Sequence, residues 1–467
     1  MEEEALNEIT VMIVGAGLGG VLLAILLERL DISYCIFERA HSVKTLGSAM
    51  SMNANIMPVF EQLGLLEEIK KISKPCESIK LHDIHMKELV EFAMSSYQDL
   101  TGYQPVVFAR PRLYNLLISQ IPSHKILRGK KVLSFEENED HVLISCSDNS
   151  QYRGDILVGA DGAYSGVRQC LFKKLEREGS LPRSDTQGMT IGYVCTVGTT
   201  ESIDPEKYPC LRDNATRFSQ VLGKDLFNYT TATVPDNQIC WALVMQHKKE
   251  GEGKELAFRN SEWAPESVET SLKDFYNFPC PFGGSMKDII DATPKECISK
   301  VFLEEKIMET WYHGRVVLIG DACHKMLPAA GQGAVNAMQD AVVLANCLYD
   351  LRSTKLEDII ASFKEYRDQR YPHARAQFDN SRLVAKLTCG QSVSDRILRH
   401  MIFKVLPESV QRRKYMKVAS YRPQACFLPL VDNRGQGPVL PQKASWRRQR
   451  ELEKRERQTA LERPTAI

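Results

Sequence analysis

The stretch Ile9–Gly20, ITVMIVGAGLGG, decides the fold. Its apolar residues predict a buried strand that stops at Gly15, and the apolar residues that follow Gly17 predict a helix. Gly15, Gly17 and Gly20 form a GxGxxG pattern, in which the first glycine permits a tight turn, the second lets the backbone approach phosphates and the third lets helix and strand pack closely. The helix start supplies free N–H groups and a positive dipole end. The stretch therefore predicts a binding site for the pyrophosphate of a dinucleotide.

A carboxylate follows at the spacing that this interpretation requires. A second apolar run, Tyr34–Phe37, ends at Glu38, 18 residues after Gly20. An acid at about this position binds the ribose hydroxyls of a dinucleotide. Arg39 is a candidate for contact with the adenosine, and a solvent-exposed surface arginine is the alternative. For the whole motif, the alternative is a glycine turn that only packs a helix against a strand.

Composition places the chain among ordinary globular proteins. With 467 residues it has room for two or three domains, and 60 Lys+Arg against 59 Asp+Glu give no overall field that favours nucleic acid. The 13 cysteines are scattered without a CxxC pair, which indicates reduced thiols. The acidic amino-terminal sequence does not resemble a secretory signal, and no run of about 18 apolar residues predicts a membrane helix. We expect a soluble, cytoplasmic protein.

Two later stretches repeat the order of strand, glycine turn and helix. In DILVGADGAYSGVR, Asp155–Arg168, the turn contains Asp161, which can orient a ribose or a nicotinamide-bearing partner, or only shape an Asx turn. In GRVVLIGDACHKMLPAAGQGAVNAMQD, Gly314–Asp340, Asp321 lies just beyond a strand, and a glycine loop precedes a helix that starts at Ala334. A carboxylate at the carboxyl end of a strand, followed by such a loop, suits a polyol chain and a polar ring.

Other candidates are less specific. Arg110 ends a short strand and can point toward the nucleotide held by the first glycine turn, or form a salt bridge at a helix start. Cys323 and His324 lie in the third motif, but spacing places no metal partners beside them. We expect both to pack or to hydrogen-bond within their loop, and we predict no metal site.

The middle of the chain has a different composition. Thr190–Thr199 and Leu226–Met245 are rich in Thr, Val, Tyr and Ile, which favours antiparallel strands. The predicted fold class is α/β, with a Rossmann-like nucleotide-binding domain, an inserted antiparallel β-sheet substrate domain and a helical carboxyl-terminal region. The predicted boundaries are residues 1–80, 104–187 and 300–375 for the first domain, 81–103 and 188–299 for the second, and 376–467 for the last region with its charged tail.

Three motifs stand in order: GAGLGG with Glu38, GADG at Gly159–Gly162, and IGDACHKMLPAAGQGA at Ile319–Ala334. Together they resemble the single-component (group A) flavoprotein monooxygenases of the p-hydroxybenzoate hydroxylase fold, over residues 9–350. The chain is most similar to fungal FAD-dependent monooxygenases of natural-product pathways, of the meroterpenoid and indole-diterpene type, which epoxidise prenyl chains or hydroxylate aromatic rings. The phrase RPQACFLPL near the carboxyl terminus also resembles that group.

The resemblance implies a set of FAD-binding residues. Gly15, Gly17, Gly20 and Glu38 match the residues that bind the ADP half, and Arg110 matches an arginine near the cofactor. Asp161 and Gly162 match a motif linked to both FAD and NADPH. Asp321 matches the aspartate beside the ribityl chain, and Gly333 and Ala334 match the helix start near the isoalloxazine. In a flavin-binding protein the extended piece that contains Ser51 runs close to the cofactor, so Ser51 is a further candidate.

For the active site, the resemblance favours Tyr229. It precedes Trp241 at the spacing at which some relatives place a tyrosine over the flavin pocket, and a tyrosine that only packs the sheet is the alternative. Tyr193 lies in the same predicted sheet, which indicates an apolar or aromatic pocket. The strand Met189–Val197 lacks an arginine that some hydroxylases present to substrate. Many fungal relatives end in a hydrophobic membrane segment, whereas this chain ends in a charged tail, so no membrane anchor is predicted.

The resemblance also implies a reaction. NADPH reduces bound FAD, O2 adds at the flavin C4a carbon, and the hydroperoxide transfers one oxygen atom to an electron-rich small molecule, by aromatic hydroxylation or alkene epoxidation in secondary metabolism. There is no second GxGxxG motif for NADPH, as expected where that nucleotide docks transiently. Two alternatives stay open: a flavin-dependent dehydrogenase or reductase of a prenyl-type substrate, and a non-catalytic carrier of a prenyl chain or partner.

Overall fold

The computed structural model describes residues 10–42, 47–223, 227–246, 272–389, 397, 399, 401–402 and 408–462. A six-stranded sheet forms the centre of the first domain, with strand order β18-β19-β12-β1-β2-β8, and the last five of these strands run parallel. Their bounds are β18 Tyr312–His313, β19 Val316–Leu318, β12 Ile156–Gly159, β1 Thr10–Val14, β2 Ser33–Glu38 and β8 Ile126–Arg128. Every residue of β12 and β19 is buried, as expected for strands covered on both faces.

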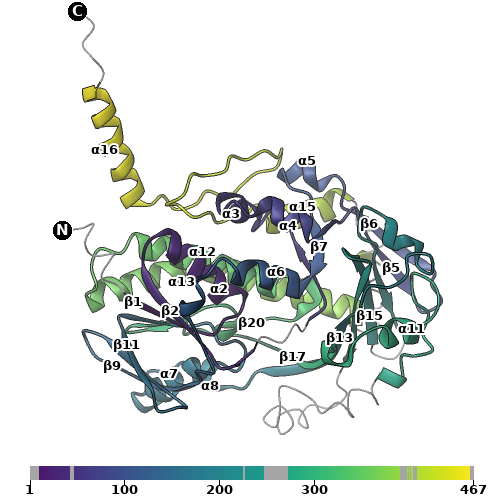
Figure 1. Cartoon of the computed structure of the whole chain (residues 1–467), viewed down its shortest axis with the longest axis horizontal. Coiled ribbons are helices and arrows are strands. Elements are labelled where there is room, and N and C mark those ends of the chain that lie inside the picture. Colours follow the sequence, from purple (N-terminus) through teal and green to yellow (C-terminus); the bar gives the residue numbers. More distant parts are fainter. Residues whose placement is uncertain are drawn as a thin grey trace, which may run out of the picture.

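Helices from distant parts of the sequence cover this sheet (Figure 1). The apolar helix α2 (Leu18–Arg29) has its first ten residues buried, and it packs along α12 (Gly333–Tyr349). Their contact is close because a Cβ at Gly19 would lie 3.1 Å from the carbonyl oxygen of Ala337. The other helices on this domain are α3 Met57–Gln62, α4 Leu66–Lys71, α6 Arg110–Ile118, α7 Gly166–Arg177 and the long α13 Leu356–Cys389.

An eight-stranded sheet forms the second layer, in the order β20-β17-β13-β16-β15-β14-β5-β6. Its neighbours are antiparallel except β14 and β5, because the hairpin of β5 and β6 comes from much earlier in the chain and joins the edge of the sheet. The bounds are β20 His324–Lys325, β17 Ser299–Ile307, β13 Thr190–Thr199, β16 Gln238–Gln246, β15 Phe227–Val234, β14 Phe218–Leu222, β5 Ser78–Asp83 and β6 Glu88–Ala93. The prediction of an inserted, largely antiparallel sheet is confirmed.

Two smaller sheets complete the described strands. One has the order β3-β7-β4 and the other β11-β10-β9. Their bounds are β3 Ala49–Met52, β7 Val106–Ala109, β4 Lys74–Pro75, β11 Gln151–Gly154, β10 Val142–Cys146 and β9 Val132–Glu137. All 13 cysteines are free thiols, in agreement with the reduced state expected from the sequence. Within the described residues, no helix combines the length and apolar character needed to cross a bilayer.

The carboxyl-terminal region crosses the first domain and ends in a projecting helix (Figure 1). Its helices are α15 Glu408–Ala419 and α16 Trp446–Glu462, and the connection between them has little regular structure. Gln62 of α3 holds this connection: its amide nitrogen donates to the carbonyl oxygens of Ala425 and Pro429 at 3.0 Å each, and its amide oxygen accepts from Ala425 N–H at 2.9 Å. Asn346 of α12 accepts from Cys426 N–H at 2.9 Å.

Gln62→Ala is expected to loosen this connection. The substitution removes three hydrogen bonds between the side chain and backbone groups, and two of these groups belong to the buried residue Ala425. Because the bonds are lost, the free energy of unfolding should fall by about 1–3 kcal/mol. Limited proteolysis should cut the segment between α15 and α16 faster than in the unmodified protein. Gln120→Ala is the matched control, because that exposed amide bonds only to its own helix and to Ser119. Equal cleavage rates for the two variants would contradict the assignment.

Candidate functional site

Four groups predicted to bind the nucleotide lie at one edge of the central sheet. Each lies at the carboxyl end of one of four neighbouring parallel strands. The Gly15 turn follows β1, Glu38 ends β2, Asp161 follows β12 and Asp321 follows β19. Because the carboxyl ends of parallel strands meet at one edge, segments from residues 15 to 321 converge there. Strands about 4.8 Å apart place the outermost of these four ends about 14 Å from each other.

The glycine turn has the geometry expected for a phosphate-binding loop. Gly15 has φ +106°, and a Cβ there would lie 2.5 Å from the carbonyl oxygen of Ala160. A Cβ at Gly20 would lie 2.3 Å from the carbonyl oxygen of Gly15. At Gly17, by contrast, a Cβ would meet nothing within 4 Å. The first and third glycines are therefore required by the packing of the chain itself, whereas the second opens onto space that a pyrophosphate fits.

Glu38 lies directly against this turn. Its carboxylate accepts from Ala16 N–H at 2.9 Å and from Ala40 N–H at 2.8 Å. No side chain caps the amino end of α2 among the described residues, so its N–H groups and dipole are available to an anion. Arg39 is exposed beside Glu38, where a surface role and contact with a nucleotide are both open to it.

The two carboxylate oxygens of Asp161 have different surroundings. One carboxylate oxygen accepts from the N–H groups of Gly166, at 2.6 Å, and Val167, at 3.2 Å, and so caps α7. The other oxygen is buried without a hydrogen-bond partner in the structure. Burial raises the pKa of Asp161, and this effect outweighs the hydrogen bonds from Ser165 and the backbone, which lower the pKa. A buried oxygen without a partner is costly, so it fits a ligand that donates a hydrogen bond.

Arg168, which the sequence did not single out, joins two of the loops. Its buried guanidinium donates to the carbonyl oxygens of Ala322, at 2.9 Å, and Ala163, at 2.6 Å. It thereby ties the turn after β12 to the turn after β19. A signal existed, since Arg168 shares the buried face of its helix with Leu171 and Leu175 at spacings of three and seven residues.

The third motif lies beside the same turns. Asp321 is half-buried and forms an ion pair with Lys325 at 2.7 Å. Gly333 and Ala334, at the start of α12, are also half-buried. The Ser51 Oγ lies 3.4 Å from the position of a Cβ on Gly331, so β3 approaches the loop that precedes α12.

Arg110 lies exposed at the start of α6, where Pro111 follows it as predicted. Its backbone N–H donates to the Ser48 carbonyl oxygen at 3.1 Å, and its Cδ lies 3.2 Å from the position of a Cβ on Gly47. These contacts connect α6 with the segment that leads into β3. The exposed guanidinium leaves Arg110 available to a ligand.

The placement of Tyr229 argues against the predicted catalytic role. Its side chain is fully buried among apolar residues, and its hydroxyl donates to the Pro279 carbonyl oxygen at 2.8 Å. Its neighbours on β16, Trp241 and Leu243, belong to the same apolar cluster. The alternating partners on β15, such as Ala232, instead pack with the first domain through β7. Tyr229 therefore lies on the face of the sheet that points away from the first domain.

Tyr229→Phe is accordingly expected to leave kcat and KM within about twofold. Losing the hydroxyl leaves the Pro279 carbonyl oxygen without that donor, so the free energy of unfolding should fall by about 1–2 kcal/mol. Steady-state kinetics and denaturant unfolding measure the two effects. A large loss of kcat with unchanged stability would restore the catalytic role.

The opposite face, turned toward the first domain, is apolar and incompletely covered. We call Tyr193, Val197, Ala242 and Val244 the inner face of the sheet. All four are half-buried, although they lie between two layers of the protein. They pack around a buried cluster that includes Leu327, from the loop before α12. Their partial exposure means that other side chains do not cover this face completely.

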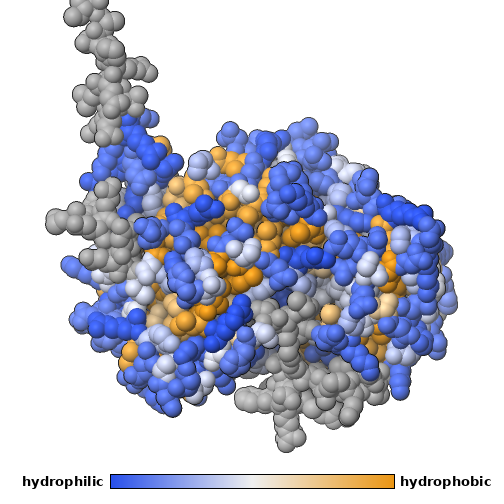
Figure 2. Space-filling view, viewed as in Figure 1, coloured by the Kyte–Doolittle hydropathy of each residue, from blue (hydrophilic) through white to orange (hydrophobic). Residues whose placement is uncertain are grey.

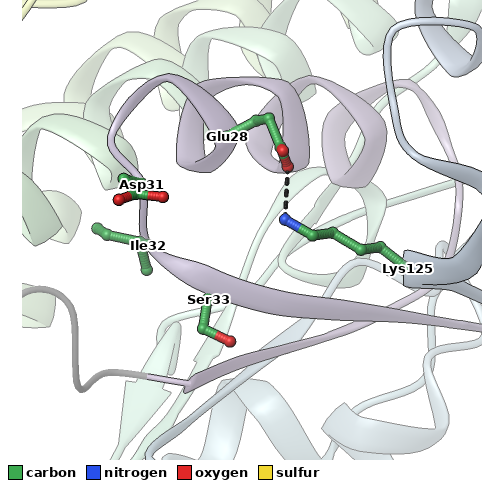
Figure 3. Close-up of a pocket in the computed structure, with 5 residues that line it drawn as sticks. All are labelled: Glu28, Asp31, Ile32, Ser33 and Lys125. Atoms are coloured by element: carbon green, nitrogen blue, oxygen red, sulfur yellow. Dashed lines mark hydrogen bonds and ion pairs between the residues drawn. The ribbon is translucent and has the colours of Figure 1, made fainter.

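A polar hollow lies at the other end of β2 (Figure 3). It is lined by Glu28, Asp31, Ile32, Ser33 and Lys125, and the Lys125 Nζ lies 2.8 Å from a Glu28 carboxylate oxygen. Ser33 begins the strand that Glu38 ends, so the hollow lies about 16 Å from the nucleotide edge. This hollow is therefore separate from the convergence of loops.

Apolar residues gather across the middle of the face drawn in Figure 2, with polar residues around them. Figure 1, in the same orientation, draws α2, α6 and α12 in this area. Apolar surface bordered by polar residues marks interaction sites and ligand-binding grooves. The molecule therefore offers apolar surface near the helices whose amino ends border the candidate site.

Comparison with known proteins agrees with this geometry. The family model described as FAD binding domain matches residues 8–207 and 286–381, which contain all three motifs. FAD-dependent monooxygenase ptmM of Penicillium ochrochloron is 30% identical over 400 residues, covering 82% of this chain and 90% of that protein. FAD-dependent monooxygenase olcE of Penicillium canescens is 28% identical over 457 residues, covering 92% of each.

Solved structures share the fold. Klebsiella pneumoniae HpxO complexed with FAD and uric acid has a TM-score of 0.72 and 21% identity, over 90% of this chain and 98% of that one. Tetracycline destructase Tet(51) has a TM-score of 0.61 and 17% identity, over 86% of this chain and 99% of that one. Both align along nearly their whole length, so the two-layer arrangement is common to all three.

Proposed function

This chain belongs to the FAD binding domain family and is an FAD-dependent monooxygenase; from that premise we propose that it uses NADPH and O2 to insert one oxygen atom into an apolar or aromatic small molecule of secondary metabolism. The observation that carries the proposal is the convergence of four strand ends around a glycine turn with open space at Gly17. The product is a hydroxylated aromatic ring or an epoxide.

The residues that hold FAD follow from the same edge of the sheet. The glycine turn and the amino end of α2 suit the pyrophosphate, and Glu38 suits a ribose. The partnerless oxygen of Asp161 suits a hydroxyl donor. The full proposed set is Gly15, Gly17, Gly20, Glu38, Arg39, Ser51, Arg110, Asp161, Asp321, Gly333 and Ala334.

The inner face of the sheet is the proposed substrate surface. Its half-buried side chains are apolar except for the Tyr193 hydroxyl, which favours binding through burial of hydrocarbon or an aromatic ring. The names of these fungal relatives specify no substrate, and the uric acid complex is one of HpxO. An apolar surface distinguishes the proposed substrate class from charged metabolites.

The cofactor supplies the redox chemistry when bound, because reduced flavin activates O2. The chain itself binds and orients the cofactor through the converging loops, and the inner face holds the substrate and excludes water from it. Only one GxGxxG motif occurs in the chain, so NADPH docks without a dedicated nucleotide-binding domain of its own.

The test is a screen of aromatic and prenylated compounds for substrate-stimulated NADPH consumption, under labelled O2 and with product mass analysis. One labelled oxygen atom per product molecule supports the proposal. NADPH consumption with a reduced or dehydrogenated product that lacks the label would identify a reductase or dehydrogenase instead. Purified protein that holds stoichiometric lipid without flavin would identify a carrier.

A further inference from the structure

Three ionisable side chains, those of His324, Asp340 and Arg370, are fully buried behind the turn that precedes Asp321. The His324 Nε2 lies 2.5 Å from one Asp340 carboxylate oxygen, and the Arg370 Nε donates to the other at 2.7 Å. All three side chains are 0% exposed. Burial alone would raise the pKa of Asp340, but His324 and Arg370 outweigh burial and lower it. A buried charge group of this kind is retained only where its partners are well placed.

The Asp340 carboxylate also reaches the backbone of the turn. The oxygen beside His324 accepts from Gly320 N–H at 2.8 Å. Gly320 has φ +61°, and a Cβ there would lie 2.8 Å from the Cβ of Ala337. The residue directly before Asp321 is therefore held from two sides, by a hydrogen bond and by close packing on α12.

The same cluster reaches the start of α12. Arg370 donates to the side-chain oxygen of Asn336 at 3.0 Å, and Asn336 donates to the Gln332 carbonyl oxygen at 2.9 Å. Gln332 in turn accepts from the Asn55 side chain at 3.0 Å and directly precedes Gly333. One carboxylate thus connects, through two short chains of hydrogen bonds, to both segments of the third motif.

We propose that Asp340 is a positioning residue for FAD: it fixes the turn that presents Asp321 and the amino end of α12 that presents Gly333 and Ala334. The inference rests on the proposed FAD contacts of those three residues. Asp340 does not touch the cofactor and acts through Gly320 N–H and through Arg370.

A metal site is the other interpretation of this cluster. Cys323, His324 and Asp340 offer ligand atoms within 4.8 Å of one another. Both Asp340 oxygens already accept hydrogen bonds, and Arg370 supplies the positive charge. A divalent cation in the same place would meet that guanidinium, so the donor set favours positioning over metal binding.

The test compares Asp340→Asn with Glu137→Gln. Glu137 is a matched control because its side chain is also a buried carboxylate, with 6% of its surface exposed. It accepts a hydrogen bond from the Arg315 backbone N–H at 2.7 Å and forms an ion pair with Lys174. Arg315 precedes β19 and Gly320 follows it, so the two carboxylates hold opposite ends of one strand region. Both substitutions should lower the unfolding midpoint of the apoprotein.

Only Asp340→Asn should weaken FAD binding, by about tenfold. The affinity is measured by fluorescence titration of the apoprotein at a temperature well below its unfolding midpoint. The visible circular dichroism of the bound flavin should also change in this variant. Glu137→Gln should stay within twofold. FAD affinity within twofold for Asp340→Asn would overturn the inference. If Asp340→Asn does not fold, Asn336→Ala is the substitute, because it removes the link to Gln332 and keeps the ion pair of Asp340 with Arg370. FAD binding to this variant should be about threefold weaker. An unchanged affinity would overturn the inference.

Asp321→Asn separates this inference from the proposed function beneath it. If Asp321→Asn weakens FAD binding and Asp340→Asn does not, the positioning role fails and the contact stands. If Asp321→Asn leaves the affinity unchanged, the Asp321 contact of the proposed function fails, and the positioning role then rests only on the route through Arg370 and Asn336 to the start of α12. Where both weaken binding, the double variant should lose less affinity than the two single losses multiplied, because Asp340 acts in part through the turn that presents Asp321.

Discussion

Gly17→Val should leave the apoprotein folded and weaken FAD binding about a hundredfold. A Cβ at this position meets no protein atom within 4 Å, and φ at Gly17 is −74°, which valine adopts readily. The side chain would instead occupy the space that the cofactor's pyrophosphate needs. Loss of two hydrogen bonds to charged oxygens, about 3 kcal/mol together, corresponds to roughly a hundredfold in affinity.

Titration of apoprotein with FAD measures the affinity, and denaturant unfolding without FAD measures the fold. Gly192→Val is the control. A Cβ at Gly192 also meets nothing within 4 Å, but this glycine lies on β13, outside the glycine turn. Gly20→Val should behave differently from both, because its Cβ would lie 2.3 Å from the Gly15 carbonyl oxygen and the protein should fail to fold. An unchanged FAD affinity for Gly17→Val would refute the assignment of the glycine turn.

Arg370→Ala should destabilise the protein strongly, because it removes one partner of a fully buried ion pair. It leaves the Asp340 carboxylate buried with only His324 and Gly320 N–H as partners, and the expected loss is about 3–5 kcal/mol of unfolding free energy. Trp311 gives a local readout, since its ring centroid lies 5.1 Å from that of His324.

Arg375→Ala on the same helix is the matched control. Arg375 pairs with Asp379 at 3.1 Å, but both side chains are about half exposed, and such pairs contribute less than about 1 kcal/mol. Tryptophan-monitored unfolding in denaturant should therefore separate the two variants by at least about 2 kcal/mol. Similar midpoints for both would mean that the buried cluster contributes little to stability.

The nucleotide edge was predictable because its signals are local. Gly15, Gly17 and Gly20 follow an apolar strand within a few residues, and each motif contains its own strand, turn and helix start. Parallel pairing then brings the turns together, since β1, β12 and β19 are neighbours in one sheet. The second sheet was predictable from composition, whereas the parallel pairing of β5 with β14 was not, because strand order depends on distant residues.

Tyr229 shows where spacing is insufficient. In the register of β15 and β16, Tyr229 and Trp241 lie on one face of the sheet, but their spacing in the sequence does not tell which face meets the first domain. That choice depends on how β15 packs against β7 and α13. The neighbours of Tyr229 on β15, Asn228 and Thr230, lie on the face that meets the first domain, where the tyrosine was predicted.

The buried cluster was missed because its members come from three separate elements. Asp340 and Arg370 are 30 residues apart and resemble ordinary polar positions of long helices. A signal was present in α12, where Asn336 and Asp340 lie one helical turn apart in a helix that is mostly apolar. Polar residues on a buried helix face require partners, and such a stripe predicts that another element supplies them.

The order of strands in the central sheet has a consequence for biosynthesis. β1 emerges from the ribosome first, yet β19 and α12, which complete the nucleotide edge, follow about 300 residues later. At roughly 5–20 residues per second, the nascent chain waits about 15–60 s before the edge can close. The β1–α2 unit is therefore synthesised long before α12, against which α2 packs, and the complete nucleotide edge can form only late in synthesis.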